Sequence, residues 1–345
     1  MTYRMRPRGR FTRRIVFALC AALAGSLAHG AEAPTEQLLS EGCLLRELRT
    51  ASDDVTAGEL RARCAREAEE TENSLLLERL RRERAAEGVR TLLTTHKRNY
   101  LIPASYSSSP NVDPFADAEG VVAVEDEIDD VEAKFQLSIK VSLAESLLTR
   151  RDRIYFGFTA LSFWQAYNRH VSAPFRETNY EPEFFWTTPL DWGPLGLDAG
   201  VLTVGLSHQS NGRGGSLSRS WNRIYANLQF EKENLVVGLR PWWRIPEDEK
   251  DDPTDAIGDD NPDIEDYLGH FDLTTVYRRG DHEWSLLLRG NADTGKGAVQ
   301  LEWAFPLWRG VRGFAQYFNG YGESLIDYDA HVERIGVGVL LNDLL

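Results

Sequence analysis

The sequence predicts an all-β fold: a twelve-stranded antiparallel transmembrane β-barrel with a short N-terminal helical periplasmic extension. Three features of the 345-residue chain predict this fold. The chain begins with a pattern typical of export, and no later apolar run of about 18 residues could cross a bilayer as a helix. Beyond the first hundred residues the chain repeats the two-residue period of β-strands. The hydrophobic fraction of 42% suits several protein classes, so the order of the residues carries the prediction.

The first segment, residues 1–30, is predicted to be a signal peptide. It contains six arginines and no acidic residue, and an apolar run extends from Ile15 to about Ala28. Such a run is too short for a transmembrane helix but is typical of the core of a signal peptide. Small residues at Ala28 and Gly30 predict cleavage after Gly30, with Ala33 as a second candidate.

The next segment, residues 31–95, is predicted to be a helical periplasmic extension. Leucines recur at helical spacing in each half, as at Leu44 and Leu48 and again at Leu76 and Leu80. The many charged residues between them favour either a small periplasmic extension or a helix that binds a partner.

Two cysteines, Cys43 and Cys64, lie in this extension. In an oxidising compartment they form either one disulfide that closes a helical hairpin or two free thiols, and the sequence leaves both alternatives open. A metal site is disfavoured, because two cysteines without a nearby histidine are an incomplete ligand set.

The remaining segment, residues 96–345, is predicted to be the barrel domain, because the apolar period changes here from 3.6 residues to 2. Aromatic residues near the ends of the segments, such as Trp164, Trp243 and Trp303, are typical of the girdles of an outer-membrane barrel. Short and long connections mostly alternate, as expected when short turns face the periplasm. The twelve predicted strands span residues 98–104, 134–144, 152–165, 180–189, 196–209, 218–230, 234–244, 266–278, 281–291, 296–305, 311–321 and 331–343.

A soluble β-sandwich is the alternative fold, since its strands also alternate. The last predicted strand places Ile335 and Val337 on one face and Gly336 and Gly338 on the other. Small residues suit a narrow barrel lumen, although Leu340 shares their face. This strand therefore favours the barrel.

The densest polar cluster spans residues 207–213 and 218–223. A serine hydroxyl needs a base to accept its proton, and the base needs a third group to hold its tautomer. His208 and Ser210 are two residues apart, so in a strand they share a face, and Asn222 lies on the next strand across a short loop. The cluster therefore predicts a nucleophilic site made of Ser210, His208 and Asn222.

All three side chains are predicted to lie on the lipid-facing side. His208 and Ser210 share parity with Leu206, and Asn222 shares parity with Ile224. Polar groups that face lipid cost free energy, which favours a site for a substrate that lies in the membrane.

A histidine considered alone would be an ordinary residue at the edge of a loop. The joint spacing and the adjacent Gly212, whose backbone N–H could donate to an oxyanion, favour a catalytic role for His208. The Gly-x-Ser-x-Gly elbow of soluble esterases is absent from this cluster.

Six short motifs together point to one family: Asn-Tyr-Leu-Ile at 99–102, Pro-Phe-Arg-Glu-Thr-Asn-Tyr-Glu-Pro at 174–182, the two halves of the polar cluster at 208–213 and 218–223, Asp-Asp-Asn-Pro-Asp at 259–263, and Gly-Tyr-Gly-Glu-Ser-Leu-Ile-Asp-Tyr at 320–328. By these motifs the chain resembles outer-membrane phospholipase A, a family of calcium-dependent enzymes of Gram-negative bacteria. The resemblance extends from about residue 98 to the end and leaves residues 31–95 uncovered.

The resemblance implies that Ser210 is the nucleophile, His208 the base and Asn222 the residue that orients His208. It implies a twelve-stranded barrel of the bacterial outer membrane, active as a homodimer, with the site toward the outer leaflet. The activity that it implies is a phospholipase A1/A2, which hydrolyses acyl esters of phospholipids and lysophospholipids.

The resemblance also implies a calcium (Ca²⁺) site. Its ligands would be the carbonyls of Arg213 and Ser218, with Asp260 and with Ser172 of the partner subunit, an oxygen set that suits this hard cation. The loop 214–217 carries no acid where some relatives supply a carboxylate, which predicts weaker binding of calcium by the monomer.

Two other functions remain as alternatives. The barrel could act as a channel or assembly element with an inactive site, or the extension 31–95 could make the protein chiefly a scaffold for a periplasmic partner. A nucleic-acid partner is disfavoured by the net charge of −14. The acidic loops, as at 125–127 and 248–252, are either a solvated surface or a means of gathering divalent cations.

Overall fold

The protein is described from a computed structural model. The described residues are 43–44, 47–48, 55–71, 74–86, 93–115, 128–149, 151–169, 174–198, 200–252, 254–255, 257–308 and 311–342. The predicted signal peptide 1–30 lies outside them. No helix in this part of the chain is both long and apolar enough to cross a membrane.

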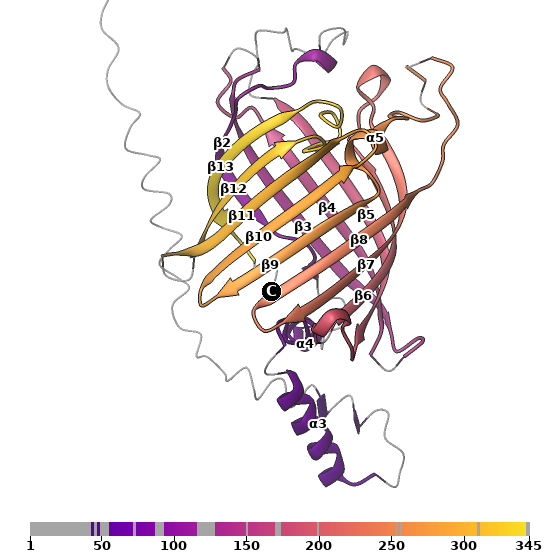
Figure 1. Cartoon of the computed structure of the whole chain (residues 1–345), viewed down its shortest axis with the longest axis vertical. Coiled ribbons are helices and arrows are strands. Elements are labelled where there is room, and N and C mark those ends of the chain that lie inside the picture. Colours follow the sequence, from indigo (N-terminus) through magenta and orange to yellow (C-terminus); the bar gives the residue numbers. More distant parts are fainter. Residues whose placement is uncertain are drawn as a thin grey trace, which may run out of the picture.

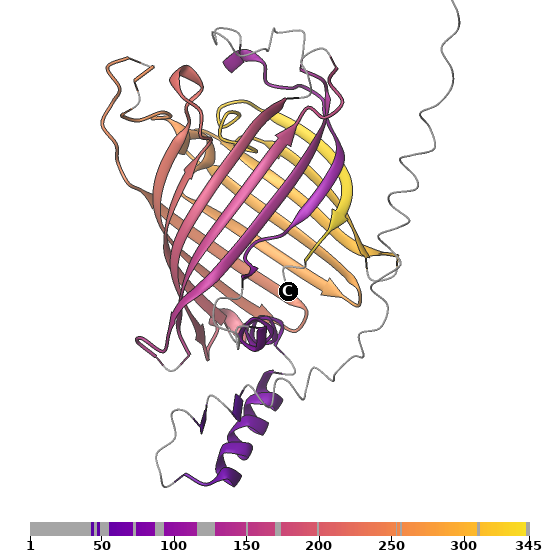
Figure 2. The same ribbon diagram turned by 180° about the vertical axis from the view of Figure 1, so that it is seen from behind.

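Twelve antiparallel strands close into a barrel (Figures 1 and 2), which confirms the predicted fold class and strand count. Neighbours in sequence pair with one another, and β13 pairs with β2 to close the sheet. The strands are β2 (Tyr100–Ser107), β3 (Val131–Glu145), β4 (Arg153–Trp164), β5 (Phe175–Leu190), β6 (Gly200–Ser210), β7 (Ser220–Lys232), β8 (Leu235–Arg244), β9 (Phe271–Arg279), β10 (His282–Asn291), β11 (Lys296–Trp308), β12 (Val311–Gly320) and β13 (Val332–Leu340).

The extension ends differently from the prediction. Its last two residues form a short strand, β1 (Thr94–Thr95), which pairs with Lys140 and Ile139 of β3. Threonine is β-branched and favours an extended backbone, and a free position beside β3 accepts it. The chain therefore enters the barrel already hydrogen-bonded to the sheet.

The barrel is apolar outside and charged inside. Along β13, Ile335 and Val337 on the outer face are 58% and 61% exposed. Arg334, which precedes Ile335 and lies on the opposite face, is 4% exposed. The lumen holds ion pairs such as that of Arg98 with Glu283, at 2.6 Å. This arrangement inverts that of a water-soluble protein and is the one that a bilayer requires of a closed sheet.

Helix α4 (Leu75–Ala86) lies at one end of the barrel, here called the helix end (Figure 1). Its Leu76 is buried in a cluster with Val201, Val236 and Val276 of the barrel wall. Helix α4 is therefore packed against the barrel wall at the mouth rather than only tethered to it.

Polar contacts hold α4 in place as well. Ser74 accepts a hydrogen bond of 3.0 Å from the N–H of Leu77, as an N-cap does. Glu83 forms an ion pair of 2.7 Å with Lys140 of β3. Burial raises the pKa of Glu83, but the cationic side chains of Lys140 and Arg79 outweigh burial, so that the pKa lies below its ordinary value.

Helix α3 (Ala57–Thr71) lies beyond α4, farther from the barrel (Figure 1). Thr56 and Glu59 form a reciprocal capping box at its start, with hydrogen bonds of 2.9 and 3.3 Å. A disulfide joins Cys43 to Cys64, with Cα atoms 5.8 Å apart. Of the two alternatives that the sequence left open, the structure has the bonded one.

Candidate active site

The predicted site residues lie on β6 and β7, near the end of the barrel opposite α4, here called the loop end. His208 faces Asn222 directly across the two strands, and Ser210 faces Ser220. The His208 Nδ1 and Asn222 Oδ1 atoms are 2.8 Å apart, a hydrogen bond in which the imidazole N–H donates to the amide oxygen. The histidine and the asparagine therefore form a pair through ordinary antiparallel register.

The pair lies on the outer wall. On β6, His208 is on the same outward face as Val204 and Leu206, which are 39% and 51% exposed. On β7, Asn222 is on the same outward face as Ile224, which is 39% exposed. The intervening Ser207 points the other way: it is 3% exposed and donates a hydrogen bond of 2.9 Å to Glu181 in the lumen. Alternation along one strand thus separates an outward serine from an inward one.

Ser210 ends β6 and is half-buried between Tyr180 of β5 and Ser220 of β7. It shares a face with His208, as two-residue spacing in a strand requires. Among the described residues, the Ser210 hydroxyl makes no hydrogen bond to His208. The strands bring the two side chains to the same surface of the barrel.

Gly212 occupies a position that favours glycine. Its φ is +66°, in the left-handed region, and an added Cβ would lie 3.2 Å from the ring of Tyr180. Within the described part of the chain, no partner accepts its backbone N–H. The turn after Ser210 therefore presents a free main-chain donor next to the strand end.

The loop that joins β6 to β7 is held by Asn211. Its amide nitrogen donates to the carbonyl of Leu217 at 2.8 Å, and its amide oxygen accepts from the N–H groups of Arg213 and Arg219 at 3.2 and 3.0 Å. Asn211 is 5% exposed, so these bonds are shielded from water. The loop is consequently fixed from within.

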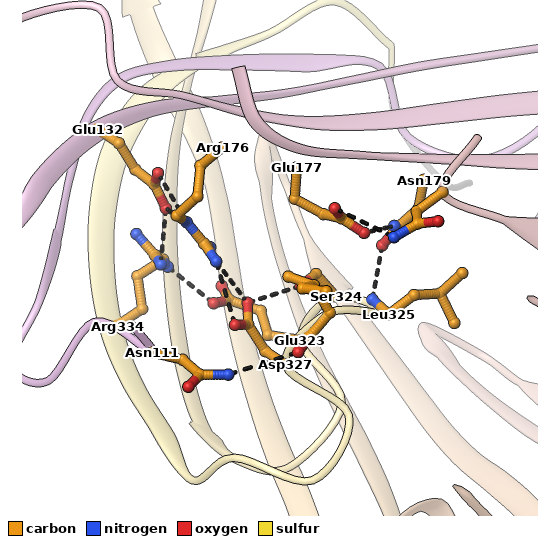
Figure 3. A network of polar contacts seen from close by, with 12 residues as sticks. Asn111, Glu132, Arg176, Glu177, Asn179, Glu323, Ser324, Leu325, Asp327 and Arg334 are labelled. Atoms are coloured by element: carbon orange, nitrogen blue, oxygen red, sulfur yellow. Dashed lines mark hydrogen bonds and ion pairs between the residues drawn. The ribbon is translucent and has the colours of Figure 1, made fainter. Parts of the chain in front are cut away.

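A buried polar network supports this loop from the lumen (Figure 3). The connection between β12 and β13 turns inward, and the N–H of its Leu325 donates to Asn179 at 2.9 Å. Asn179 in turn donates to Glu177 at 2.6 Å, and Glu177 accepts from Arg213 at 3.3 Å. A continuous chain of hydrogen bonds thus connects the inward loop to the loop after Ser210.

The same inward loop carries acids that pair with lumen cations. Asp327 binds Arg176 at 2.9 Å, and Glu323 binds Arg334 at 2.7 Å (Figure 3). Glu323 also binds Lys134 at 2.8 Å. Burial raises the pKa of Glu323, but the two cations outweigh burial and lower it to about 2. Ion pairs therefore anchor the loop in its charged state.

The predicted calcium ligands are only partly assembled. Asp260 accepts hydrogen bonds of 2.9 Å from the hydroxyls of both Ser218 and Ser220, and it forms an ion pair with Lys250. The carbonyl of Ser218 accepts from the Arg219 guanidinium at 2.7 Å. Several oxygen atoms thus lie close together here, and positively charged side chains of the chain already contact them. Oxygen ligands of this kind are the ones that a hard cation such as calcium prefers.

The other predicted ligands add less to this set. Ser172 lies outside the described residues. Arg213 is on the same loop as Ser218, and its guanidinium donates to Glu177 and to the carbonyl of Arg176. In the described ranges no three His, Cys, Asp or Glu side chains form a metal cluster. A site built mainly of carbonyls and hydroxyls would not form such a cluster.

Sequence reasoning missed two residues of the loop after β8. The Asn222 Nδ2 atom donates to Glu247 at 3.1 Å, and Lys250 contacts Asp260. In the sequence both belong to an acidic stretch that reads as solvated surface. The available signal was strand adjacency, since β8 pairs with β7 and its following loop must begin beside Asn222.

The fold and this surface define a class of protein: an integral membrane β-barrel with a histidine–asparagine pair and a serine on its lipid-facing wall. A family model described as phospholipase A1 matches residues 76–341. The chain therefore belongs to the phospholipase A1 family.

Curated relatives agree with this assignment. A putative phospholipase A1 of Neisseria meningitidis serogroup B is 41% identical over 257 residues, which cover 72% of this chain and 65% of the relative. The chain thus spans less than two thirds of that relative's length. Phospholipase A1 of Escherichia coli K12 is 40% identical over 213 residues, covering 62% of this chain and 70% of the relative.

Solved structures have the same fold. Outer membrane phospholipase A from Escherichia coli superimposes with a TM-score of 0.66 at 36% identity, covering 74% of this chain and all of that one. The outer membrane phospholipase of Salmonella typhi, solved as a dimer with bound calcium, gives a TM-score of 0.65 at 36% identity over 74% of this chain and 93% of that one.

Proposed function

We propose that this protein is a calcium-dependent outer-membrane phospholipase A1/A2 that hydrolyses acyl esters of phospholipids and lysophospholipids. The observation that carries the proposal is the His208–Asn222 hydrogen bond of 2.8 Å on the lipid-facing wall, two residues from the outward Ser210. A base held in a fixed tautomer beside a serine is the arrangement that acyl transfer requires.

In this proposal Ser210 attacks the ester carbonyl while the Nε2 atom of His208 accepts its proton. The bond between the acyl carbon and the glycerol oxygen then breaks, and His208 returns the proton to the departing alcohol. Water attacks the acyl-serine by the same route in reverse and releases the fatty acid. Asn222 keeps the other ring nitrogen of His208 protonated through both halves of the reaction.

The oxyanion of each step would be stabilised by the free N–H of Gly212. When bound, calcium would add positive charge near the ester oxygen. Its proposed ligands are the carbonyls of Arg213 and Ser218, with Asp260 and Ser172 of the partner subunit. The converging oxygens at Asp260 support this proposal, as does the calcium-bound dimer of the Salmonella typhi relative.

The proposed division of the chain is a signal peptide (1–30), a helical periplasmic extension (31–95) and the barrel domain (96–345). If the extension is periplasmic, the helix end faces the periplasm and the site at the loop end faces the outer leaflet. In an intact outer membrane, a single barrel would meet few phospholipids and would lack a complete calcium site. Because the homodimer would complete that site, activity would be confined to a damaged membrane.

The test is fatty-acid release from mixed phospholipid–detergent micelles by the refolded protein, with calcium and with chelator. We expect calcium-dependent release that Ser210→Ala abolishes and that Ser216→Ala, a change in an exposed serine of the adjacent loop, leaves intact. Absence of release from a folded wild-type barrel at every calcium level would contradict the proposal and favour a channel or a scaffold.

A further inference from the structure

Asn222 lies between two polar side chains rather than one. Its Oδ1 atom is 2.8 Å from the Nδ1 atom of His208, and its Nδ2 atom is 3.1 Å from the Oε1 atom of Glu247. The three side chains form a row His208–Asn222–Glu247 across the outer wall, with the carboxylate at the end remote from Ser210.

The carboxylate determines which way the amide points. An ionised glutamate can only accept hydrogen bonds, so the group that faces Glu247 must be the amide nitrogen of Asn222. The amide oxygen is then turned toward His208, where it can only accept. The Nδ1 atom of His208 therefore carries the proton, and its Nε2 atom keeps a lone pair for the hydroxyl of Ser210.

Without such a partner, an asparagine is ambiguous in a way that an aspartate is not. A carboxylate presents an acceptor in either orientation, whereas an amide that turns by 180° presents a donor. A donor at the Nδ1 atom of His208 would favour the opposite tautomer, in which Nε2 is protonated and cannot accept the serine proton. A site that uses asparagine consequently needs a further group to fix the amide.

The backbone delivers Glu247 to this position. The N–H of Ile245 donates to the carbonyl of Asn222 at 2.8 Å, so the loop after β8 begins in register with β7. Arg244, the last residue of β8, donates to the carbonyl of Pro262 at 3.0 Å and forms an ion pair with Asp259. The N–H of Asp259 donates to the carbonyl of Asp248 at 2.7 Å. The main chain is therefore hydrogen-bonded at Ile245 and at Asp248, on either side of Glu247.

We infer that Glu247 is a positioning residue that fixes the amide of Asn222 and, through it, the catalytic tautomer of His208. The effect of this tautomer on ester hydrolysis rests on the proposed function, whereas the positioning of Asn222 by Glu247 does not. Partners of this kind, which orient a group that orients the reacting one, typically change activity by about 10- to 100-fold when they are removed.

The test compares Glu247→Gln with Glu249→Gln in the full chain. Glutamine can donate as well as accept, so the first change removes the constraint on the amide, and the second makes the same charge change at an exposed residue of the same loop. We expect Glu247→Gln to lower kcat by about tenfold with KM unchanged. Glu249→Gln should match the wild type, and Glu247→Asp should recover part of the loss.

A spectroscopic readout separates positioning from folding and from activity. In the ¹⁵N-histidine-labelled protein in detergent, the wild-type His208 should show a protonated Nδ1 and an unprotonated Nε2, and Glu247→Gln should show a mixture of tautomers. An unchanged tautomer in Glu247→Gln would overturn the inference, whatever the activity. If the wild type releases no fatty acid but its tautomer depends on Glu247, the positioning role stands and the proposed function fails.

Discussion

The polar cluster inside the barrel and the one on its outer wall differ in how fully their groups are paired. Inside, Arg176 donates from all three of its nitrogens, to Glu132 and to Asp327, and none of these side chains exceeds 5% exposure. Outside, His208 makes one hydrogen bond through Nδ1, and in the described structure nothing accepts from or donates to its Nε2. A fully paired cluster stabilises the fold, whereas a base with a free nitrogen remains available for chemistry.

The two polar clusters also differ in where they lie, one in the lumen and the other on the lipid-facing wall. Charges in the lumen lie beside apolar clusters such as that of Tyr155, Phe185 and Trp221, and mutual pairing offsets the desolvation of these charges. Polar groups on the lipid-facing wall cost free energy there. Substitutions should therefore separate the two clusters: outer changes should alter the rate, and inner changes should alter stability.

The largest expected effect is that of His208→Ala. Removing the base of a serine site lowers kcat by a factor on the order of 10⁴ or more, because the hydroxyl of Ser210 loses its proton acceptor. Urea unfolding in lipid vesicles, followed by tryptophan fluorescence, should match the wild type, since the side chain is exposed. An unfolding midpoint that falls together with the activity would contradict the division between the clusters.

The opposite outcome is expected for Arg176→Met. The substitution leaves Glu132 and Asp327 buried with fewer partners, which costs about 3–5 kcal/mol in the free energy of unfolding. The same urea titration measures it. The fraction that remains folded should release fatty acid at a rate within a few-fold of the wild type, because the residue touches none of Ser210, His208 and Asn222. A wild-type midpoint would show that the lumen network contributes little.

Acid should weaken the ion pairs of Glu323 in the inner cluster. Its folded pKa of about 2 lies below the ordinary value of 4.5, so its contribution is present above that ordinary value and is lost as pH falls toward 2. We expect wild-type stability to decline over this window and the decline to be shallower in Glu323→Gln, as measured by urea midpoints at a series of pH values. Parallel curves for the two proteins would contradict this account of the inward loop.

A smaller effect is expected at the oxygens around Asp260. Lys250 is paired with this carboxylate, so calcium must displace the ammonium group to reach it. Lys250→Ala should raise the affinity for calcium alone about fivefold, corresponding to an ion pair worth about 1 kcal/mol. Titration calorimetry measures the change, with Lys232→Ala as the control at the helix end. An unchanged affinity would show that calcium does not use Asp260.

Strand period and parity were sufficient to predict twelve strands and the shared outward face of His208, Ser210 and Asn222. The predicted strand 266–278 was wrong at its start, because Ile264–Leu268 form the short helix α5 and β9 begins at Phe271. Both properties are local, since a two-residue period determines which side chains point outward. The contacts of Glu247 and the link from Leu325 to Asn179 were not predictable in this way. They join residues 25 and 146 positions apart. The first contact depends on the path of the loop after β8, and the second depends on closure of the barrel.

The helical extension shows the same limit. Leucine spacing predicts a helix around Leu76, but which surface that helix covers depends on the diameter and lining of the mouth, to which distant strands contribute Val201, Val236 and Val276. The pairing of Cys43 with Cys64 likewise depends on how the helical segments are arranged in space, and spacing alone left it open.

Covalent labelling is the most direct test that Ser210 is a nucleophile activated by His208. A long-chain alkyl fluorophosphonate reacts with an activated serine, and peptide mass spectrometry locates the adduct. We expect one adduct, on Ser210, that forms at a greatly reduced rate in His208→Ala, and no adduct on Ser207 of the same strand, which faces the lumen. An adduct on another serine, or one on Ser210 that forms equally fast without His208, would contradict the account.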